Sequence, residues 1–297
     1  MEKNSQQEIG RFISQIKDLP TLPTVMEKIV TLTNDPDVSI ARVEEAIATD
    51  PVISTKLLRI VNSAYFSFFR EITSLRQAIV VLGLEATKNL VYGTSIISAF
   101  GRESKIKQFP LEGFWRYSVA CGNISRTLAS LLDYTFYEEA FLAGLVHNIG
   151  KLVIAKYRPE DFEKSIAKAM SDDIPLSEAE QEIIGFDHNE VGHQLAVRWR
   201  LPLLLDEIIS FNERPAEAEN FKEMTSIVRL ASLLCRSNGI GVSGEPEVTW
   251  DIQQDIAWSV LSQENEMLEV LDFERFNLTL DEEVEKVESF VRAIFAP

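Results

Sequence analysis

The feature that most constrains the fold is a helical spacing of apolar residues along nearly the whole chain, punctuated by residues that start helices. Ser39 precedes a pattern that places Val43 and Ile47 on one helix face. Asp50 stands directly before Pro51, so a capping side chain is followed by proline in the first helical position. No segment shows a convincing alternation of period two. The sequence therefore predicts an all-α protein.

Two further helix starts have the spacing of a capping box. In this motif, two residues three positions apart each accept, with the side chain, a hydrogen bond from the backbone N–H of the other. Ser74 and Gln77 form the first, and Thr279 and Glu282 form the second, before an amphipathic C-terminal helix. The helix after Ser74 is dense in apolar residues, namely Ile79, Val80, Leu82 and Leu84. This density predicts a central buried helix.

A polar, basic stretch at 101–110 is the candidate junction between two subdomains. We expect an N-terminal helical subdomain at 1–107. An HD-like helical subdomain at 108–297 would follow and end in a helical extension. A second irregular stretch at 238–248 contains three glycines and one proline.

The composition predicts a globular cytoplasmic protein. The chain has 297 residues, of which 45% are hydrophobic, enough for a substantial core. Its most apolar stretch, 78–100, is interrupted by charged side chains and holds no run near the ~20 residues of a membrane span. The N-terminus lacks the features of a signal peptide. Cys121 and Cys235 are its only cysteines, which suits a reducing compartment and core packing.

The net charge of -17 argues against a general nucleic-acid binder, because such binding depends on cations that neutralise phosphates. The stretch 51–107 is nevertheless basic, and a nucleotide or nucleic-acid site built on Arg59, Arg70 and Arg76 is a third-ranked hypothesis. The neighbouring segment 65–70 carries four aromatic side chains. These rings could stack on bases, but packing in a core or against a partner is the favoured interpretation.

The segment 144–152 has the frame of a helix that carries an adjacent His-Asp metal pair, but His147 is followed by Asn148. A carboxylate can bridge two divalent ions, whereas a neutral amide is a weak donor without charge. The chain has only two other histidines, His188 and His193. On one helix they would face ~140° apart, so they cannot chelate one ion together.

Several motifs in this order resemble the HDOD family, the HD-related output domains of bacterial signalling proteins. They are Leu19-Pro20-Thr21-Leu22-Pro23, Val61-Asn62-Ser63-Ala64-Tyr65, the run 72–83, Phe141-Leu142-Ala143-Gly144-Leu145 before His147, Phe186-Asp187-His188, and Trp199-Arg200-Leu201-Pro202. The resemblance covers about 19–235. It implies a helical fold whose second part is similar to HD and HD-GYP phosphohydrolases.

The resemblance also implies where the family's metal ligands would fall. The first histidine falls on Tyr117, the His-Asp pair on His147 and Asn148, and the distant aspartate on Ser232. One extra histidine of HD-GYP enzymes matches His188. These five residues would line a vestigial pocket, and we expect no cofactor.

The favoured hypothesis is a non-catalytic signalling module that binds a protein partner, such as a receiver domain or kinase in trans, or a small ligand. The alternative is a divergent metal-dependent phosphohydrolase acting on nucleotides or cyclic dinucleotides. It would use His147 and His188 with carboxylates from Asp187, Glu190 or Glu213.

Overall fold

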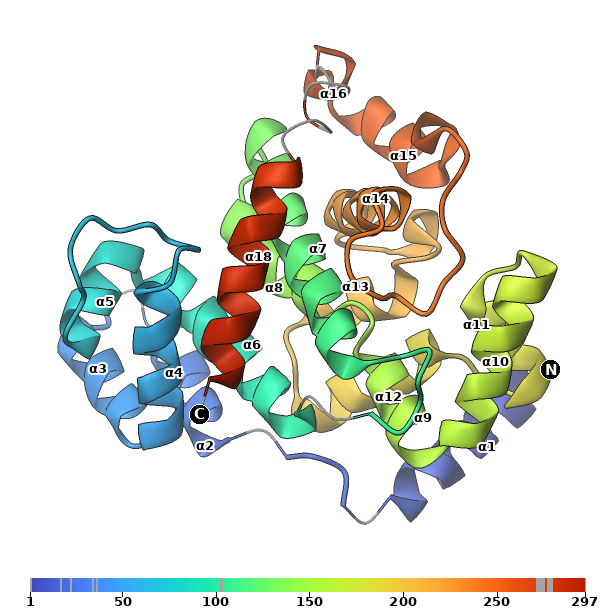
Figure 1. Cartoon of the computed structure of the whole chain (residues 1–297), viewed down its shortest axis with the longest axis horizontal. Helices are drawn as coiled ribbons and strands as arrows, with labels where there is room; N and C mark the ends of the chain where they lie inside the picture. Colours follow the sequence, from blue (N-terminus) through green and yellow to red (C-terminus); the bar gives the residue numbers. More distant parts are fainter. Residues whose placement is uncertain are drawn as a thin grey trace. The chain divides into compact units, whose positions relative to one another are not determined.

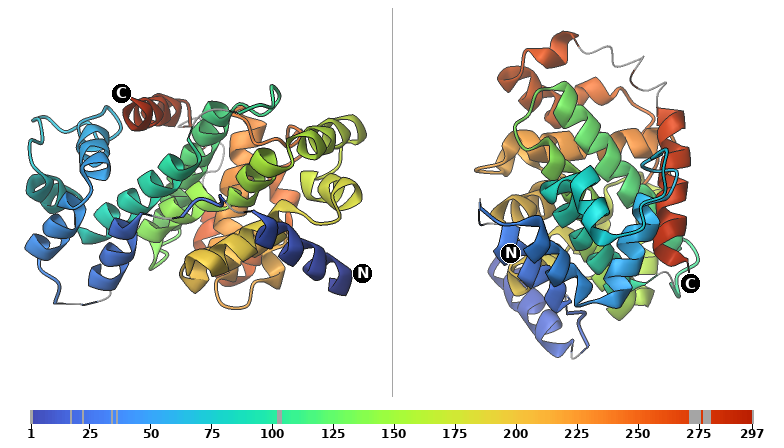
Figure 2. Two further views of the ribbon diagram at one scale, coloured as in Figure 1. Left: turned by 90° about the horizontal axis from the view of Figure 1, so that it is seen from below. Right: turned by 90° about the vertical axis from the view of Figure 1, so that its left-hand side faces the viewer.

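In the computed structural model, residues 2–296 are described apart from 17, 22, 34, 36, 102–103, 271–275 and 277–279. They form two compact units (Figures 1 and 2). One unit comprises Met1–Leu19 with Arg102–Phe273, and the other comprises Pro20–Gly101 with Glu274–Pro297. The sequence predicts the subdomains 1–107 and 108–297 instead. The compact units therefore differ from that division at both ends of the chain.

The described residues contain helices and no strand, as the sequence predicts. The smaller unit combines helices from the first third of the chain with the last helix. They are α2 (Thr24–Thr33), α3 (Ile40–Ala48), α4 (Pro51–Val61), α5 (Leu75–Leu82), α6 (Leu84–Phe100) and α18 (Leu280–Phe295). Helix α18 packs on α4 although more than 200 residues separate them along the chain (Figure 1).

The larger unit holds the remaining elements: α1 (Glu2–Gln15), α7 (Leu111–Leu131), α8 (Tyr137–Val146), α9 (Ile149–Tyr157), α10 (Pro159–Asp172), α11 (Leu176–Ile183), α12 (His188–Trp199), α13 (Leu203–Phe211), η1 (Pro215–Glu217), α14 (Lys222–Ser237), η2 (Ile252–Gln254), α15 (Ile256–Glu264) and α16 (Met267–Val270). Helix α7 packs along α8 and α14, and α12 packs on α9 and α13. The N-terminal helix α1 packs on α12 (Figure 2).

Three of the predicted helix starts are confirmed. The side chain of Ser39 accepts a hydrogen bond from the backbone of Arg42, and Asp50 caps the two residues after Pro51. Ser74 accepts from the backbone N–H of Gln77 at 3.2 Å. The Gln77 side chain accepts from the backbone of Thr73, one residue before the expected position. The box at Thr279 and Glu282 lies outside the described residues.

The prediction that the helix after Ser74 is central and buried is wrong. In α5 only Ala78 and Ile79 are buried, and the Val80 side chain is 61% exposed. The buried helix is the next one, α6, in which ten consecutive or near-consecutive residues are covered. The polar side chains of α6 are not typical of a buried helix, yet two of them, Thr87 and Asn89, are buried.

Close packing in the larger unit depends on glycines that leave room for a neighbouring backbone. A Cβ on Gly144 of α8 would lie 2.6 Å from the Cys121 carbonyl of α7. A Cβ on Gly150 of α9 would lie 1.9 Å from the His188 carbonyl of α12. Both distances are far below ordinary contact, so these helices approach closely only because a side chain is absent.

The aromatic segment divides into a packed part and an exposed part. Tyr65 is buried, and its ring lies 4.9 Å from that of Phe290 in α18. Phe69 is fully exposed. The packing interpretation therefore holds for Tyr65.

Among the described helices, none has the length and apolar character needed to cross a bilayer.

Candidate functional site

Four of the five predicted site residues meet in one hydrogen-bonded cluster. Tyr117 comes from α7, His147 and Asn148 from the junction between α8 and α9, and Ser232 from α14. The Tyr117 hydroxyl lies 3.2 Å from Nε2 of His147 and 2.7 Å from Oγ of Ser232. It also accepts from Nδ2 of Asn148 at 3.3 Å. Tyr117, His147 and Asn148 are buried, and Ser232 is partly exposed.

The hydrogen bonds assign the protonation state of His147. Its Nδ1 lies 2.7 Å from the carbonyl oxygen of Gly144, which can only accept. Nδ1 therefore carries the proton, and Nε2 accepts from the Tyr117 hydroxyl. Burial lowers the pKa of His147 to about 3, despite the bond to Gly144. Burial also raises the pKa of Tyr117 well above its ordinary value. Both side chains are neutral at pH 7.

This donor set does not suit a hard divalent cation. Such ions require several convergent ligands with negative charge, and none of the four residues is anionic. Both nitrogens of His147 are engaged within the protein. The Oδ1 of Asn148 is buried without a hydrogen-bond partner among the described residues, but a single neutral amide oxygen is a weak ligand.

The irregular stretch after α14 packs against the backbone of α7 beside Tyr117. Val242 donates its backbone N–H to the carbonyl of Gly113 in α7 at 2.9 Å. Gly241 has φ +72°, and a Cβ there would lie 2.4 Å from the backbone nitrogen of Tyr117. A glycine is needed at this position for both the positive φ and the close approach.

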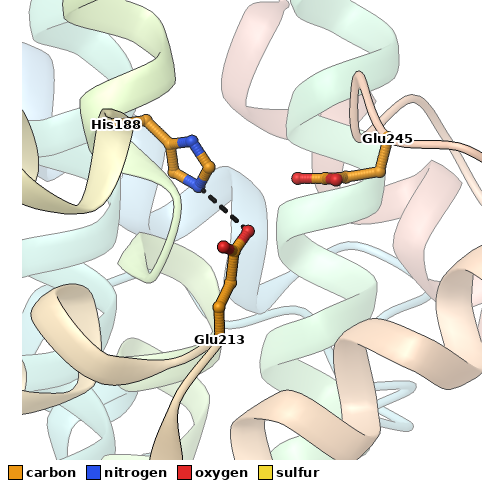
Figure 3. Close-up of side chains that lie close together, drawn as sticks. All are labelled: His188, Glu213 and Glu245. Atoms are coloured by element: carbon orange, nitrogen blue, oxygen red, sulfur yellow. Dashed lines mark ion pairs between the residues drawn. The ribbon is translucent and has the colours of Figure 1, made fainter. Parts of the chain in front are cut away.

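The fifth predicted residue, His188, belongs to a separate cluster. Its Nδ1 and its backbone N–H both donate to Oε2 of Glu180, at 2.7 and 2.8 Å. Its Nε2 lies 3.5 Å from Oε1 of Glu213 (Figure 3). Asp187 and Glu190, the other expected carboxylates, form the capping box of α12 instead. The nitrogens of His147 and His188 therefore have different partners, and these hydrogen bonds do not bring the two rings around one ion.

A buried ion pair adjoins His188. Nζ of Lys151 lies 2.5 Å from Oε1 of Glu245, and the two side chains are 0% and 5% exposed. Lys151 also donates to the carbonyl of Ser243, and Oε2 of Glu245 accepts from the backbone of Leu176. Burial opposes ionisation of Glu245, but Lys151 and Arg236 outweigh it and hold its pKa well below the usual range.

Sequence reasoning missed Lys151, Glu180 and Glu245. A signal existed for Lys151, because it is the only charge in the apolar run 140–155. A single charge in such a run indicates a buried partner. Glu180 and Glu245 carry no such signal, since each lies among other polar residues.

A cavity of about 500 Å³ opens beside the His188 cluster. Glu213 and Glu245 line it, together with Arg229, Arg236 and Trp250. Arg229 is committed to a bidentate pair with Asp255, and Arg236 donates to the carbonyl of Pro246. None of the five predicted site residues lines this cavity.

His193 lies apart from both clusters. It is half-exposed, and its Nδ1 lies 2.7 Å from Oδ1 of Asp206. The hydrogen bond to Asp206 raises the pKa of His193. His188 and His193 therefore have different hydrogen-bond partners.

The two cysteines are buried, as expected for core side chains. The structure also brings them together, with the Cys121 and Cys235 sulfurs 3.6 Å apart between α7 and α14. Burial raises the pKa of Cys235 well above its ordinary value. A raised pKa is the opposite of what a nucleophilic thiol requires, so Cys235 is not a candidate nucleophile.

Acid is expected to destabilise the protein through His147. Between pH 6.5 and 3 only the unfolded chain binds a proton at this residue, because the folded pKa is about 3. The free energy of unfolding then falls by about 1.4 kcal/mol per pH unit, or about 2 kcal/mol at pH 5. Urea unfolding of wild type and His147→Gln at pH 7 and pH 5 measures this.

The wild type should lose more stability between these pH values than the variant does. His188 acts in the same direction in both proteins, so the difference isolates His147. His193 has the opposite sign, because its raised pKa gives stability at acid pH that is lost as the pH rises through the folded value. Equal losses in the two proteins would contradict the assignment of a neutral His147.

Known proteins resemble this chain in fold. A structure of an HDOD domain protein with unknown function from Geobacter sulfurreducens superposes with a TM-score of 0.82 at 24% identity, covering 100% of both chains. A structure named "Putative phosphohydrolase", from Shewanella amazonensis SB2B, has a TM-score of 0.67 at 25% identity over 95% of this chain and 96% of its own. A third, named "Putative signal transduction protein", from Marinobacter aquaeolei VT8, has a TM-score of 0.75 at 20% identity over 98% and 65%.

The sequence comparison gives one curated relative, an uncharacterized protein of Treponema pallidum, 27% identical over 224 residues. The match covers 75% of this chain and 43% of that protein, so the chain spans less than half of its relative. The HDOD domain itself matches residues 19–215, close to the predicted 19–235. The chain belongs to the HDOD domain family.

Proposed function

We propose that this protein is a non-catalytic regulatory module of a cytoplasmic signalling pathway, with a degenerate HD site. The observation that carries the proposal is the hydrogen bond between the Tyr117 hydroxyl and Nε2 of His147, two buried side chains. A histidine whose two nitrogens are both hydrogen-bonded offers no lone pair to a metal.

The loss extends over the whole set of family positions. Tyr117, Asn148 and Ser232 stand where the resemblance places a histidine and two aspartates. Each replacement is neutral, and together they bond to one another rather than leaving an opening. A single changed ligand could be replaced by a neighbour. Three changes that form their own network favour a structural role.

The proposed role is recognition of a protein partner or small ligand. Family membership supports a link to signalling, and the Marinobacter neighbour is named for signal transduction. We propose a receiver domain or a kinase, acting in trans, as the partner. The acidic excess of 108–297, with 34 acidic and 16 basic residues, favours a partner with a basic face.

A phosphohydrolase is the second candidate, supported by the Shewanella neighbour. In its predicted form it uses His147 and His188 on one ion. The hydrogen bonds disfavour this form, because His147 bonds to Tyr117 and Gly144 and His188 bonds to Glu180.

Hydrolysis assays separate the two candidates. Purified protein supplied with Mn²⁺, Fe²⁺ or Zn²⁺ should not cleave bis-p-nitrophenyl phosphate or cyclic dinucleotides above the rate of buffer with the same metal. His147→Ala should leave any background rate unchanged. Turnover that disappears in His147→Ala, while His193→Ala retains it, would establish the phosphohydrolase and overturn the proposal.

A further inference from the structure

Nε2 of His188 is a fully buried polar atom with no hydrogen-bond partner among the described residues. It points toward the carboxylate of Glu213, and Glu245 reaches toward the same space from the opposite side (Figure 3). Buried polar atoms are almost always satisfied, so an orphaned ring nitrogen aimed between two carboxylates requires an explanation.

The other side of the ring shows which form of the imidazole is present. Oε2 of Glu180 accepts from both the backbone N–H and Nδ1 of His188. Nδ1 therefore carries the proton. Nε2 makes no hydrogen bond among the described residues, so with the proton on Nδ1 it holds a bare lone pair in the neutral ring. At 3.5 Å it faces Oε1 of Glu213, which can only accept as an ionised carboxylate.

Two acceptors that face each other repel unless a cation lies between them. The distance matches such an arrangement. Nitrogen and oxygen ligands at about 2.0–2.1 Å from a tetrahedral zinc ion are about 3.3 Å apart. One atom from each of His188, Glu213 and Glu245 lies within 4.8 Å of the others. Small rotations of the two glutamates would bring all three to an ion.

The surroundings also suit a cation. Glu180 orients His188 through Nδ1, which is the role that a carboxylate plays behind a metal-bound histidine. Lys151 neutralises part of the charge on Glu245, yet each oxygen of a carboxylate can accept from more than one partner. Two carboxylates and one neutral imidazole favour zinc or manganese over calcium or magnesium.

We propose that His188, Glu213 and Glu245 bind a divalent cation, preferably Zn²⁺, at a site distinct from the His147 cluster. The ion would join α12, the turn after α13 and the irregular stretch after α14, which supply one ligand each. Glu213 and Glu245 line the 500 Å³ cavity, so ions and exchangeable ligands have a route to it. This site requires no hydrolysis and is independent of the proposed function.

Zinc titration of tag-free, chelator-treated protein tests the proposal. Isothermal calorimetry with Zn²⁺ should give one site per chain, and bound Zn²⁺ should raise Tm. Glu213→Gln removes one ligand charge while keeping the shape of a side chain that is 20% exposed, so this variant should fold. We expect its affinity for Zn²⁺ to fall at least tenfold.

Glu178→Gln is the matched control, because Glu178 lines the same cavity but lies outside the cluster. Its affinity should equal that of wild type. No binding by wild type, unchanged binding by Glu213→Gln, or a loss of binding in His147→Ala instead would each overturn the cation site. None of these results bears on the hydrolysis assay above, so the two proposals fail separately.

Discussion

Replacing Lys151 with methionine is expected to lower the free energy of unfolding by about 3–5 kcal/mol, because it leaves the carboxylate of Glu245 buried without its cation. Both side chains are almost completely covered, and their charged atoms lie 2.5 Å apart. Chemical denaturation of the metal-free protein measures the loss.

Lys156→Met is the matched control for this experiment. Lys156 lies on the same helix, α9, but is exposed, with its ammonium 5.6 Å from the ring of Tyr157. Its replacement should cost at most about 1 kcal/mol.

The double variant Lys151→Met/Glu245→Gln decides the cause. Since a neutral side chain then replaces the stranded carboxylate, much of the stability should return. Additive losses would show instead that Lys151 contributes by packing alone.

The sequence predicts the helical fold well because helix starts are local. The capping side chains of Ser39, Asp50 and Ser74 bond to backbone groups two or three residues away, so spacing alone reveals them. Burial is decided at longer range. Val80 has the right spacing for a core helix and is exposed, because the contacts of α5 within its unit reach only part of its surface.

In the candidate site, too, one part is predictable from the sequence and another part is not. Resemblance located Tyr117, His147, Asn148 and Ser232 together, and the hydrogen bonds agree with that grouping. The sequence names Glu213 as a carboxylate near His188, and the structure places it there. The sequence does not indicate Glu180 or Glu245, since these come from two other segments of the chain. The irregular stretch 238–248 is an example of what the sequence does not predict. Nothing in its residues shows that it packs against Tyr117 and places Glu245 beside Lys151.

Changing Gly150 to alanine is expected to destabilise the protein by about 3 kcal/mol or more, although alanine is the better helix former. The added Cβ would lie 1.9 Å from the carbonyl oxygen of His188 and 2.8 Å from the backbone nitrogen of Gly192. Both are backbone atoms, so no side chain can turn aside and α9 must separate from α12. Thermal and urea unfolding of the variant measure the cost.

Gly10→Ala is the control, because Gly10 also lies within a helix but has no atom within 4 Å of an added Cβ. This variant should be neutral or gain up to about 1 kcal/mol from the helix preference of alanine. Since Gly150 borders both Lys151 and the backbone of His188, Gly150→Ala should also weaken Zn²⁺ binding where it still folds. A Gly150→Ala protein as stable as Gly10→Ala would show that α9 and α12 are not held in close contact, and the geometry around His188 would lose its support.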